Sequence, residues 1–307
     1  GAAIPFSGMS AAPFHSSAFS ALSCVNSGHR VFIHGGVATP LRLLEGLIEH
    51  AGRLRDVEIL HIHTHGEPRY ADPEFHRSFR VSNLFVGPNM RSKLDYERVD
   101  YLPCFLSEIP LLFRSGIRPP DIALVQLTPP DAHGYCSLGT SVDIARAAVE
   151  TARIVVAQLN PRLPRVQGDG FLHMRELDAW IEVDDPIPEV HPLPPTPEEQ
   201  TIGRNIANLV EDGATLQCGI GAIPDAALKA LGGHRHLGLH TEMWSDGALE
   251  LIRSGAIDNS RKIVHPGRTV SGFLQGTRAL YDFVHDNPTV IQLDIAYVNH
   301  PGVIQRN

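Results

Sequence analysis

The sequence has no hydrophobic run long enough to cross a membrane, and it has only four cysteines in 307 residues. Apolar runs such as Ile122–Leu127 and Ile154–Leu159 are far shorter than the ~20 residues of a membrane helix and have the length of buried strands. The cysteines show no CxxC spacing, which argues against a zinc knuckle or a disulfide framework. We therefore expect a soluble protein of a reducing compartment, the cytoplasm or alternatively the mitochondrial matrix.

Basic residues are also few, since 26 Lys and Arg stand against 34 Asp and Glu and give a net charge of -8. A phosphate backbone or an anionic membrane selects the opposite sign, so we expect neither nucleic acid nor a membrane as partner. Residues 1–23 contain no Lys, Arg, Asp or Glu, unlike a secretory signal or an intact transit peptide. We expect a flexible or processed N-terminus there.

The length exceeds the ~100–200 residues of one domain, and 43% hydrophobic residues are typical of a globular chain. One composition break stands out at 186–197, where closely spaced prolines favour a stiff, extended linker. We therefore expect an N-terminal α/β domain over 24–185, a linker over 186–197 and a C-terminal α/β domain over 198–307.

Short β-branched runs alternate with helical patterns on both sides of this linker, which predicts two open α/β domains with mostly parallel sheets. The first half predicts strands at 30–33, 57–63, 121–127 and 153–158 and helices at 39–51 and 141–152; the second predicts helices at 198–211 and 224–231 and strands at 214–218 and 236–240. Segments 28–40 and 213–224 share the order glycine, strand, glycine-rich turn, proline, helix. They indicate two related domains packed face to face, with chance similarity as the alternative.

The most informative turn is Gly219-Ile220-Gly221-Ala222-Ile223-Pro224, between a predicted strand and a predicted helix. Glycines let a ligand approach the backbone, and the amides of a helix N-terminus attract an anion. Pro224 stands where the dinucleotide fingerprint would need its third glycine. The turn therefore predicts a phosphate or oxyanion site, or only a tight connection.

Glu242 follows one βαβ unit after this turn, so the strand that ends there should reach the same sheet edge. Adjacent strands are ~4.8 Å apart, which brings the Glu242 carboxylate within reach of whatever the turn holds. A carboxylate in that place can act as a nucleophile or a base. The alternative is a solvated acid or a salt-bridge partner.

Two further clusters have competing interpretations. His61, His63 and His65 alternate and would share one strand face, which suggests a metal-dependent hydrolase, although 17 histidines make chance clusters common and we expect no metal. Hydroxyls and amides of the turn-rich segment 129–141 could line a cleft. Ser141 alone is more typical of a helix N-cap.

At these residues the sequence resembles the acetyl-CoA hydrolase and 4-hydroxybutyrate CoA-transferase family, a branch of the class I CoA-transferases. The likeness runs from about Gly28 to the last residue. It rests on five stretches in the same order: VFIHGG (31–36), FLSEIP (105–110), DAHGYCSLG (131–139), QCGIGAIP (217–224) and HTEMWSDG (240–247).

The resemblance implies that Glu242 attacks an acyl-CoA thioester and becomes an enzyme-CoA thioester by way of an acyl-glutamyl anhydride. It implies that CoA is a substrate, with no metal or redox cofactor, and that His34 and Gln217 are acyl-pocket or oxyanion donors. The residues expected to contact CoA are Gly219, Ile220, Gly221, Ala222 and Ile223.

The resemblance thus predicts a CoA-transferase that moves CoA between a small acyl-CoA, of the acetyl, butyryl or 4-hydroxybutyryl type, and a free carboxylate. The alternative is an acetyl-CoA hydrolase that uses the same glutamate with water, and a more distant one is a non-catalytic CoA-binding chain. Family members continue beyond the point that matches Asn307. We therefore expect an incomplete second domain, completed by a complementary chain or fragment, and a homo-oligomer.

Overall fold

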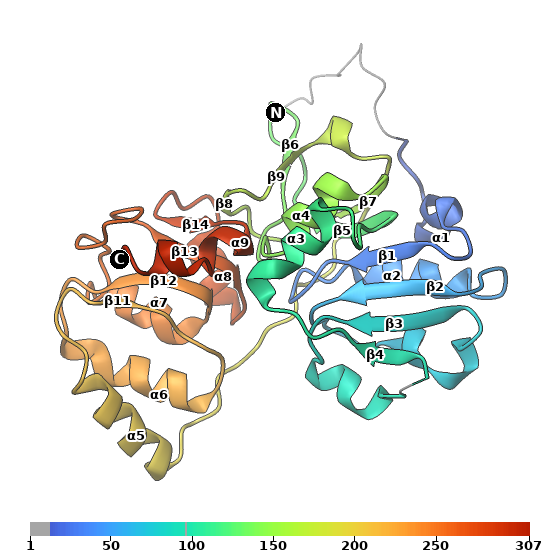
Figure 1. The fold of residues 1–307 in the computed structure, drawn as a ribbon. Coiled ribbons are helices and arrows are strands. Elements are labelled where there is room, and N and C mark those ends of the chain that lie inside the picture. The colour runs from blue at the N-terminus through green and yellow to red at the C-terminus, as the bar shows by residue number, and fades with distance from the viewer. Residues whose placement is uncertain (1–12, 96) are drawn as a thin grey trace.

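The first sheet has seven short strands, all parallel. The computed structural model describes residues 13–95 and 97–307, and the strand order in this sheet is β10-β7-β5-β1-β2-β3-β4 (Figure 1). Central strands such as β5 are buried along their whole length, as a parallel sheet covered on both faces requires. The bounds are β1 (Arg30–Ile33), β2 (Val57–His61), β3 (Phe79–Asn83), β4 (Val99–Tyr101), β5 (Ile122–Leu127), β7 (Ile154–Leu159) and β10 (Ala179–Glu182).

Helices cover both faces of this sheet. Successive strand residues point to opposite faces, so Val31 and Ile33 enter one apolar core and Phe32 enters the other. The core with Val31 takes its helical residues from α1 (Ala18–Ala21) and α2 (Leu41–Glu49), and the core with Phe32 takes them from α3 (Ile109–Arg114) and α4 (Ala145–Thr151).

The second sheet is also parallel, in the order β11-β12-β13-β14-β8. Its strands are β8 (Gln167–Gly168), β11 (Thr215–Leu216), β12 (Gly238–Trp244), β13 (Thr269–Leu274) and β14 (Val290–Gln292). The helices that accompany it are α5 (Pro197–Ala207), α6 (Ala222–Ala230), α7 (Asp246–Arg253), α8 (Arg278–Val284), α9 (Ile295–Val298) and α10 (Pro301–Ile304). The small strands β6 (Tyr135–Ser137) and β9 (Phe171–His173) form a separate antiparallel pair.

The two sheets share one apolar core on the side where they meet. Residues of α6, α7 and α8 form another core with the second sheet, to which Val37, Ala38, Leu163 and Val166 from the chain before the linker also belong. Val270 of β13, Ile291 of β14 and Ile295 of α9 instead belong to the core that contains α3 and α4. The second sheet and α9 therefore pack directly on the first unit, with α9 between them (Figure 1).

The proline-rich segment 186–197 has neither helix nor strand before α5 begins at its last residue. Its first part lies against the second unit, because Ile187 is buried and the Tyr281 hydroxyl donates to the Pro188 carbonyl at 2.8 Å. β8 lies before this segment in the chain but pairs with β14, so the second sheet takes one strand from the predicted N-terminal domain. The domain limits stay predictions, as does the flexible or processed segment 1–23, of which 1–12 lie outside the described residues.

The predicted α/β class with mostly parallel sheets is confirmed, and the strand at Arg30–Ile33 is correct at both ends. The similarity between segments 28–40 and 213–224 is only local, because β1 lies in the interior of its sheet whereas β11 lies at the edge of the other sheet. In the described part of the chain, no helix has the length and apolarity needed to cross a membrane.

Most element boundaries differ from the predictions by one or more residues, and two of the differences involve candidate site residues. β2 ends at His61, two residues early, and the helix predicted from 141 begins only at Ala145. Ser141 is therefore not the N-cap; its hydroxyl donates to Asp143 Oδ2 at 2.7 Å. The N-cap is Ile144, which makes no side-chain capping bond, and Asp143 Oδ1 accepts the backbone amides of Ile144 and Ala145 at 2.5 and 3.1 Å.

Candidate functional site

Glu242 lies inside β12 rather than at its end, because the strand continues to Trp244. The pairs Thr241–Ser271 and Met243–Phe273 join β12 to β13, and they place Glu242 beside Gly272. The predicted position at the strand terminus is therefore wrong by two residues. The glutamate is half-buried and is held on the rigid backbone of an interior strand.

The glycine-rich turn reaches Glu242 through the pairing of β11 with β12. Leu216 pairs with Leu239, and the Thr241 hydroxyl accepts the Cys218 amide at 2.9 Å while lying 3.0 Å from the Cys218 carbonyl oxygen. The pairing itself ends at Leu216, and the Cys218 contacts hold the start of the turn against Thr241, the residue before Glu242. The start of the predicted CoA loop therefore lies against the strand that carries the predicted nucleophile.

The loop itself is open to solvent. Gly221 precedes α6 with φ 129° and ψ 175°, a conformation that only glycine adopts without strain. The Ile220 side chain is 60% exposed, and Gln217 is exposed as well. Backbone amides at the start of α6, a nine-residue helix, are therefore accessible from this side.

Asn299 holds the carboxylate of Glu242. Its side-chain amide donates to Glu242 Oε2 at 2.7 Å. Within residues 13–95 and 97–307, Glu242 Oε1 accepts no hydrogen bond, and this oxygen is not fully buried. One oxygen of Glu242 is thus fixed by the protein and the other remains available to a ligand.

His34 lies at the end of β1 but not in contact with solvent. Its Nδ1 accepts the backbone amide of Gln126 at 3.2 Å, so its Nε2 carries the proton and donates to the Ser141 carbonyl at 2.6 Å. Complete burial lowers the pKa of His34 to about 4, which keeps the ring neutral. In this conformation both nitrogens serve the protein, and His34 positions Ser141.

Two titratable side chains, Lys262 and His240, lie at the part of β12 before Glu242. Lys262 packs over Gly238, and its ammonium donates to the backbone carbonyl oxygens of Leu239 at 2.9 Å and Arg268 at 2.6 Å. Burial lowers the pKa of Lys262 to about 7. His240 lies two residues before Glu242, and its Nε2 donates to the Val298 carbonyl at 2.9 Å, with its pKa lowered chiefly by burial.

The three clustered histidines do not share one face, because β2 ends at the first of them. His61 Nε2 lies 3.1 Å from the Tyr70 hydroxyl, whereas the His63 ring packs against Phe85 and Phe273. The backbone amide of His65 donates to the Thr39 hydroxyl at 3.0 Å instead. Within the described residues no three His, Cys, Asp or Glu side chains are placed to hold a metal ion, so the metal-hydrolase hypothesis has no geometric support.

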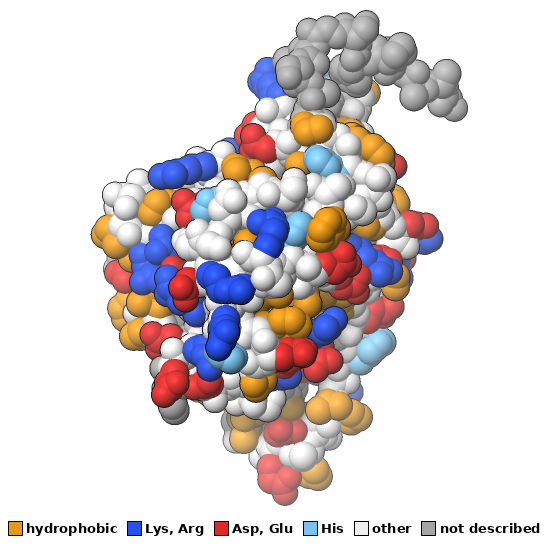
Figure 2. Space-filling model, turned by 90° about the vertical axis from the view of Figure 1, so that its right-hand side faces the viewer, with side chains coloured by type: hydrophobic (Ala, Val, Ile, Leu, Met, Phe, Trp, Pro, Cys, Tyr) orange, Lys and Arg blue, Asp and Glu red, His pale blue; other side chains and the backbone are white. Residues whose placement is uncertain are grey.

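Figure 2 shows one face of the molecule, on the side of the seven-stranded sheet. Lys and Arg side chains gather near its middle, with Asp and Glu side chains around and between them. Separately from this view, the buried carboxylate of Glu58 in β2 pairs with Arg30, Arg80 and Arg118.

Sequence reasoning missed Asn299 and Asp143. Asn299 follows a one-turn helix near the end of the chain, far from any glycine-rich turn, and carries no motif that would connect it with residue 242. Asp143 lies inside the helix predicted at 141–152, for which the sequence pattern favours Ser141 as the N-cap. Burial raises the pKa of Asp143 to about 6, and the nearby Asp294 adds to the shift.

Known proteins resemble this chain over most of its length. It is 49% identical to a succinyl-CoA:acetate/propanoyl-CoA:succinate CoA transferase of Fasciola hepatica, over 92% of this chain and 59% of the relative. It is 42% identical to a 4-hydroxybutyrate coenzyme A transferase of Clostridium kluyveri, over 94% of this chain and 67% of the relative. The chain therefore spans about three fifths to two thirds of these relatives.

Solved structures agree with this likeness. The 4-hydroxybutyrate CoA-transferase of Porphyromonas gingivalis matches with a TM-score of 0.84 and 36% identity, covering 94% of this chain and 69% of that one. RipA from Yersinia pestis matches with a TM-score of 0.91 and 31% identity, covering 95% and 70%. The model of the acetyl-CoA hydrolase/transferase N-terminal domain matches residues 14–191, more than half of the chain. Because family model, sequence relatives and fold agree, the chain belongs to the acetyl-CoA hydrolase/transferase family.

Proposed function

We propose that this chain is an acyl-CoA:carboxylate CoA-transferase in which Glu242 is the nucleophile. The observation that carries the proposal is the hydrogen bond from Asn299 to Oε2, which orients the carboxylate while leaving Oε1 available. The position of Glu242 beside the exposed Gly219–Ile223 turn supports it as well. The names of the relatives, which are CoA transferases, agree with the same chemistry.

The proposed reaction has two mirrored halves. Glu242 attacks the thioester carbonyl of an acyl-CoA, a carbon–oxygen bond forms, and the carbon–sulfur bond breaks to give an acyl-glutamyl anhydride and CoA thiolate. The thiolate then attacks the glutamyl carbonyl, and the acyl group leaves as its carboxylate. A second carboxylate reverses these steps on the enzyme-CoA thioester and departs as the new acyl-CoA.

The Gly219–Ile223 turn is the proposed CoA contact. Its open backbone amides at the start of α6 suit the negative charge of a tetrahedral oxyanion or of a CoA phosphate. Gln217, exposed at the end of β11, is the proposed side-chain donor to the acyl or carboxylate oxygen. His34 is proposed to act indirectly, by holding the segment at Ser141 in place.

CoA enters this scheme as a substrate, and the scheme needs no metal or redox cofactor. The acyl partner is proposed to be small and aliphatic, with a free carboxylate as acceptor. Assembly as a homo-oligomer or with a complementary chain, and location in the cytoplasm or mitochondrial matrix, stay predictions.

Mass spectrometry of the natural full-length polypeptide with acetyl-CoA tests the proposal. We expect a mass gain of one CoA less one water, mapped by peptide analysis to Glu242 and absent from Glu242→Ala. Acetate-dependent exchange of CoA indicates transfer, whereas thioester loss in water alone indicates the hydrolase. Tight CoA binding with no adduct and no turnover would overturn the mechanism and favour a non-catalytic CoA-binding chain.

A further inference from the structure

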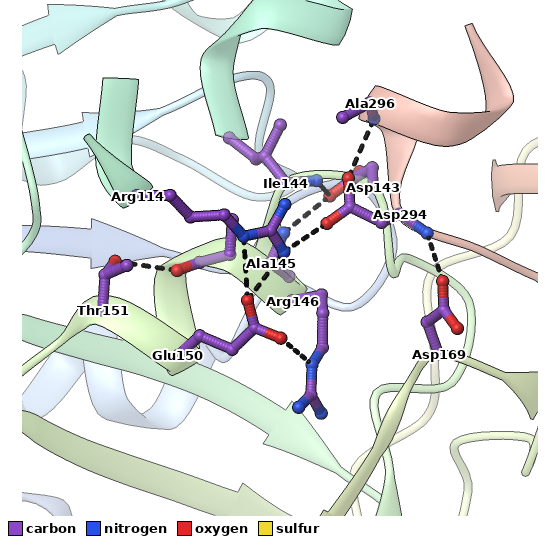
Figure 3. Close-up of polar contacts among 11 residues, drawn as sticks. Arg114, Asp143, Ile144, Ala145, Arg146, Glu150, Thr151, Asp169, Asp294 and Ala296 are labelled. Atoms are coloured by element: carbon purple, nitrogen blue, oxygen red, sulfur yellow. Dashed lines mark hydrogen bonds and ion pairs between the residues drawn. The ribbon is translucent and has the colours of Figure 1, made fainter. Parts of the chain in front are cut away.

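The one-turn helix α9 is anchored to the first unit through an ion pair. Arg114, the last residue of α3, contacts Asp294 Oδ2 at 2.6 Å and Glu150 Oε2 at 2.7 Å (Figure 3). Asp294 immediately precedes α9, and its side chain is only 12% exposed. The Arg114 side chain is 37% exposed, so water screens the pair in part, but the burial of Asp294 makes the contact less screened than a pair between two exposed side chains.

Asp294 is also hydrogen-bonded to α9 itself. Its Oδ1 accepts the backbone amide of Ala296 at 2.8 Å, which makes Asp294 the N-cap of the helix. Its own amide donates to Asp169 Oδ2 at 3.0 Å, and the next amide, of Ile295, donates to the Asp143 carbonyl at 3.1 Å. Every partner outside α9 in these contacts comes from the chain before the linker, as Figure 3 shows.

The other end of α9 contacts the candidate nucleophile. Asn299, the C-cap of the helix, donates to Glu242 Oε2 at 2.7 Å, and the Val298 carbonyl accepts the His240 ring at 2.9 Å. At a rise of about 1.5 Å per residue, Asp294 and Asn299 lie roughly 7 to 8 Å apart along this turn. A helix so short moves as one body, so a shift at Asp294 displaces Asn299.

Close packing adds to this rigidity. Ile295 is completely buried, and a Cβ placed on Gly272 would lie 2.6 Å from its Cδ1 and 3.2 Å from the Glu242 carbonyl oxygen. Glycine at position 272 is therefore what lets α9 approach the sheet beside Glu242. Little room remains in which α9 could compensate for a lost anchor without moving Asn299.

We infer that Arg114 is a positioning residue for the proposed CoA transfer, because its ion pair with Asp294 holds α9 so that Asn299 can orient Glu242. This inference rests on the proposed function. Arg114 does not touch the reacting atoms; it acts through Asp294, α9 and Asn299. Loss of the pair is expected to slow attack by Glu242 while leaving CoA binding at the glycine-rich turn nearly unchanged.

A double-mutant cycle in the full-length polypeptide tests the pathway. Arg114→Gln should lower the single-turnover rate of adduct formation at Glu242 on the order of tenfold to a hundredfold, with KM for acetyl-CoA changed less than about twofold. Once Asn299→Ala is present, Arg114→Gln should cost less than about twofold more, because the route to Glu242 is already broken. Additive losses would overturn the inference, and Arg114→Lys should restore part of the rate.

Two further measurements separate the inference from the proposed function. Hydrogen exchange of peptides that contain α9 should become faster in Arg114→Gln whether or not any adduct forms; unchanged exchange overturns the anchor. Arg146→Gln is the matched control, because Arg146 pairs with Glu150 at 2.7 Å in the same network without contacting Asp294, and it should leave rate and exchange unchanged. If the unmodified protein forms no adduct while exchange responds as expected, the proposed function fails and the anchor stands.

Discussion

The side-chain amide of Asn299 donates a 2.7 Å hydrogen bond to Oε2 of Glu242, although the two residues are 57 positions apart in the chain. The contact joins the end of α9 to the interior of β12. It selects one of the two carboxylate oxygens, so the protein fixes the direction from which the other oxygen meets a ligand.

Removal of this contact tests its role. Asn299→Ala should slow adduct formation at Glu242 by about tenfold to a hundredfold, since a hydrogen bond to a charged group contributes about 1.5 to 3 kcal/mol. Asn299→Asp should be worse, because it places a second carboxylate against the first. The measurement is the single-turnover rate by mass spectrometry, and a rate for Asn299→Ala equal to that of the unmodified protein would contradict the assignment.

Alanine substitutions at two glycines of the proposed CoA loop should distinguish an effect on acetyl-CoA binding from an effect on the stability of the fold. An added Cβ at Gly219 would meet only Pro224 Cγ at 3.9 Å, an ordinary contact, whereas Gly221 adopts φ 129°. Gly219→Ala should therefore raise KM for acetyl-CoA with an unchanged unfolding midpoint, and Gly221→Ala should change both. Steady-state kinetics beside thermal unfolding check this; an unchanged KM in both variants would argue against a CoA contact here.

Pairing of β8 with β14 should depend on glycine at position 168. Gly168 has φ 118°, and an added Cβ would overlap the carbonyl oxygen of Gln292 in the neighbouring strand. Gly168→Ala should cost more than about 2 kcal/mol in the free energy of unfolding. Gly232→Ala is the matched control, because nothing lies within 4 Å of its added Cβ, and it should stay within about 0.5 kcal/mol. Equal stability of the two variants in urea would contradict the prediction.

Buried histidines should make the fold sensitive to acid. Burial lowers the pKa of His34, His61 and His63 to about 4, whereas in the unfolded chain they titrate near 6.5. Between these values the unfolded state binds more protons, so stability is full above about pH 6.5 and falls as the pH drops to about 4. Each group contributes on the order of 3 kcal/mol at most. The free energy of unfolding, measured with urea at several pH values in this range, should depend less steeply on pH in His34→Gln than in the unmodified protein.

Asp143 should act in the opposite direction. Its pKa is raised to about 6, so between about pH 4 and 6 the folded state holds a proton that the unfolded state has lost. Its contribution to stability is therefore greatest at low pH and declines as the pH rises to about 6. Asp143→Asn removes this opposing effect, and its stability should fall more steeply on acidification than that of the unmodified protein. A shallower slope would show that the sign is wrong.

Local patterns predicted β1, β2, β5, β7, β11 and β12, because buried apolar runs such as Ile122–Leu127 leave little choice of structure. They did not predict the other parallel strands, β3, β4, β8, β10, β13 and β14. The predicted ends of elements were wrong where contacts outside the local sequence pattern decide them. The helix predicted at 141 starts only at Ala145; the Ser141 hydroxyl bonds Asp143 Oδ2, and Asp143 Oδ1 accepts the amides of Ile144 and Ala145. β12 continues past Glu242 because β13 offers partners as far as Leu274.

The sequence by itself determined the α/β class, the glycine-rich turn, and the proximity of that turn to Glu242, since a single βαβ unit fixes which strand ends lie together. Only the tertiary structure decided that Asn299 orients Glu242 and that Arg114 anchors α9. Contacts between units depend on how whole sheets and helices pack, and no local periodicity encodes that packing. For the same reason His34, which looked like a free donor, has both ring nitrogens committed to the protein.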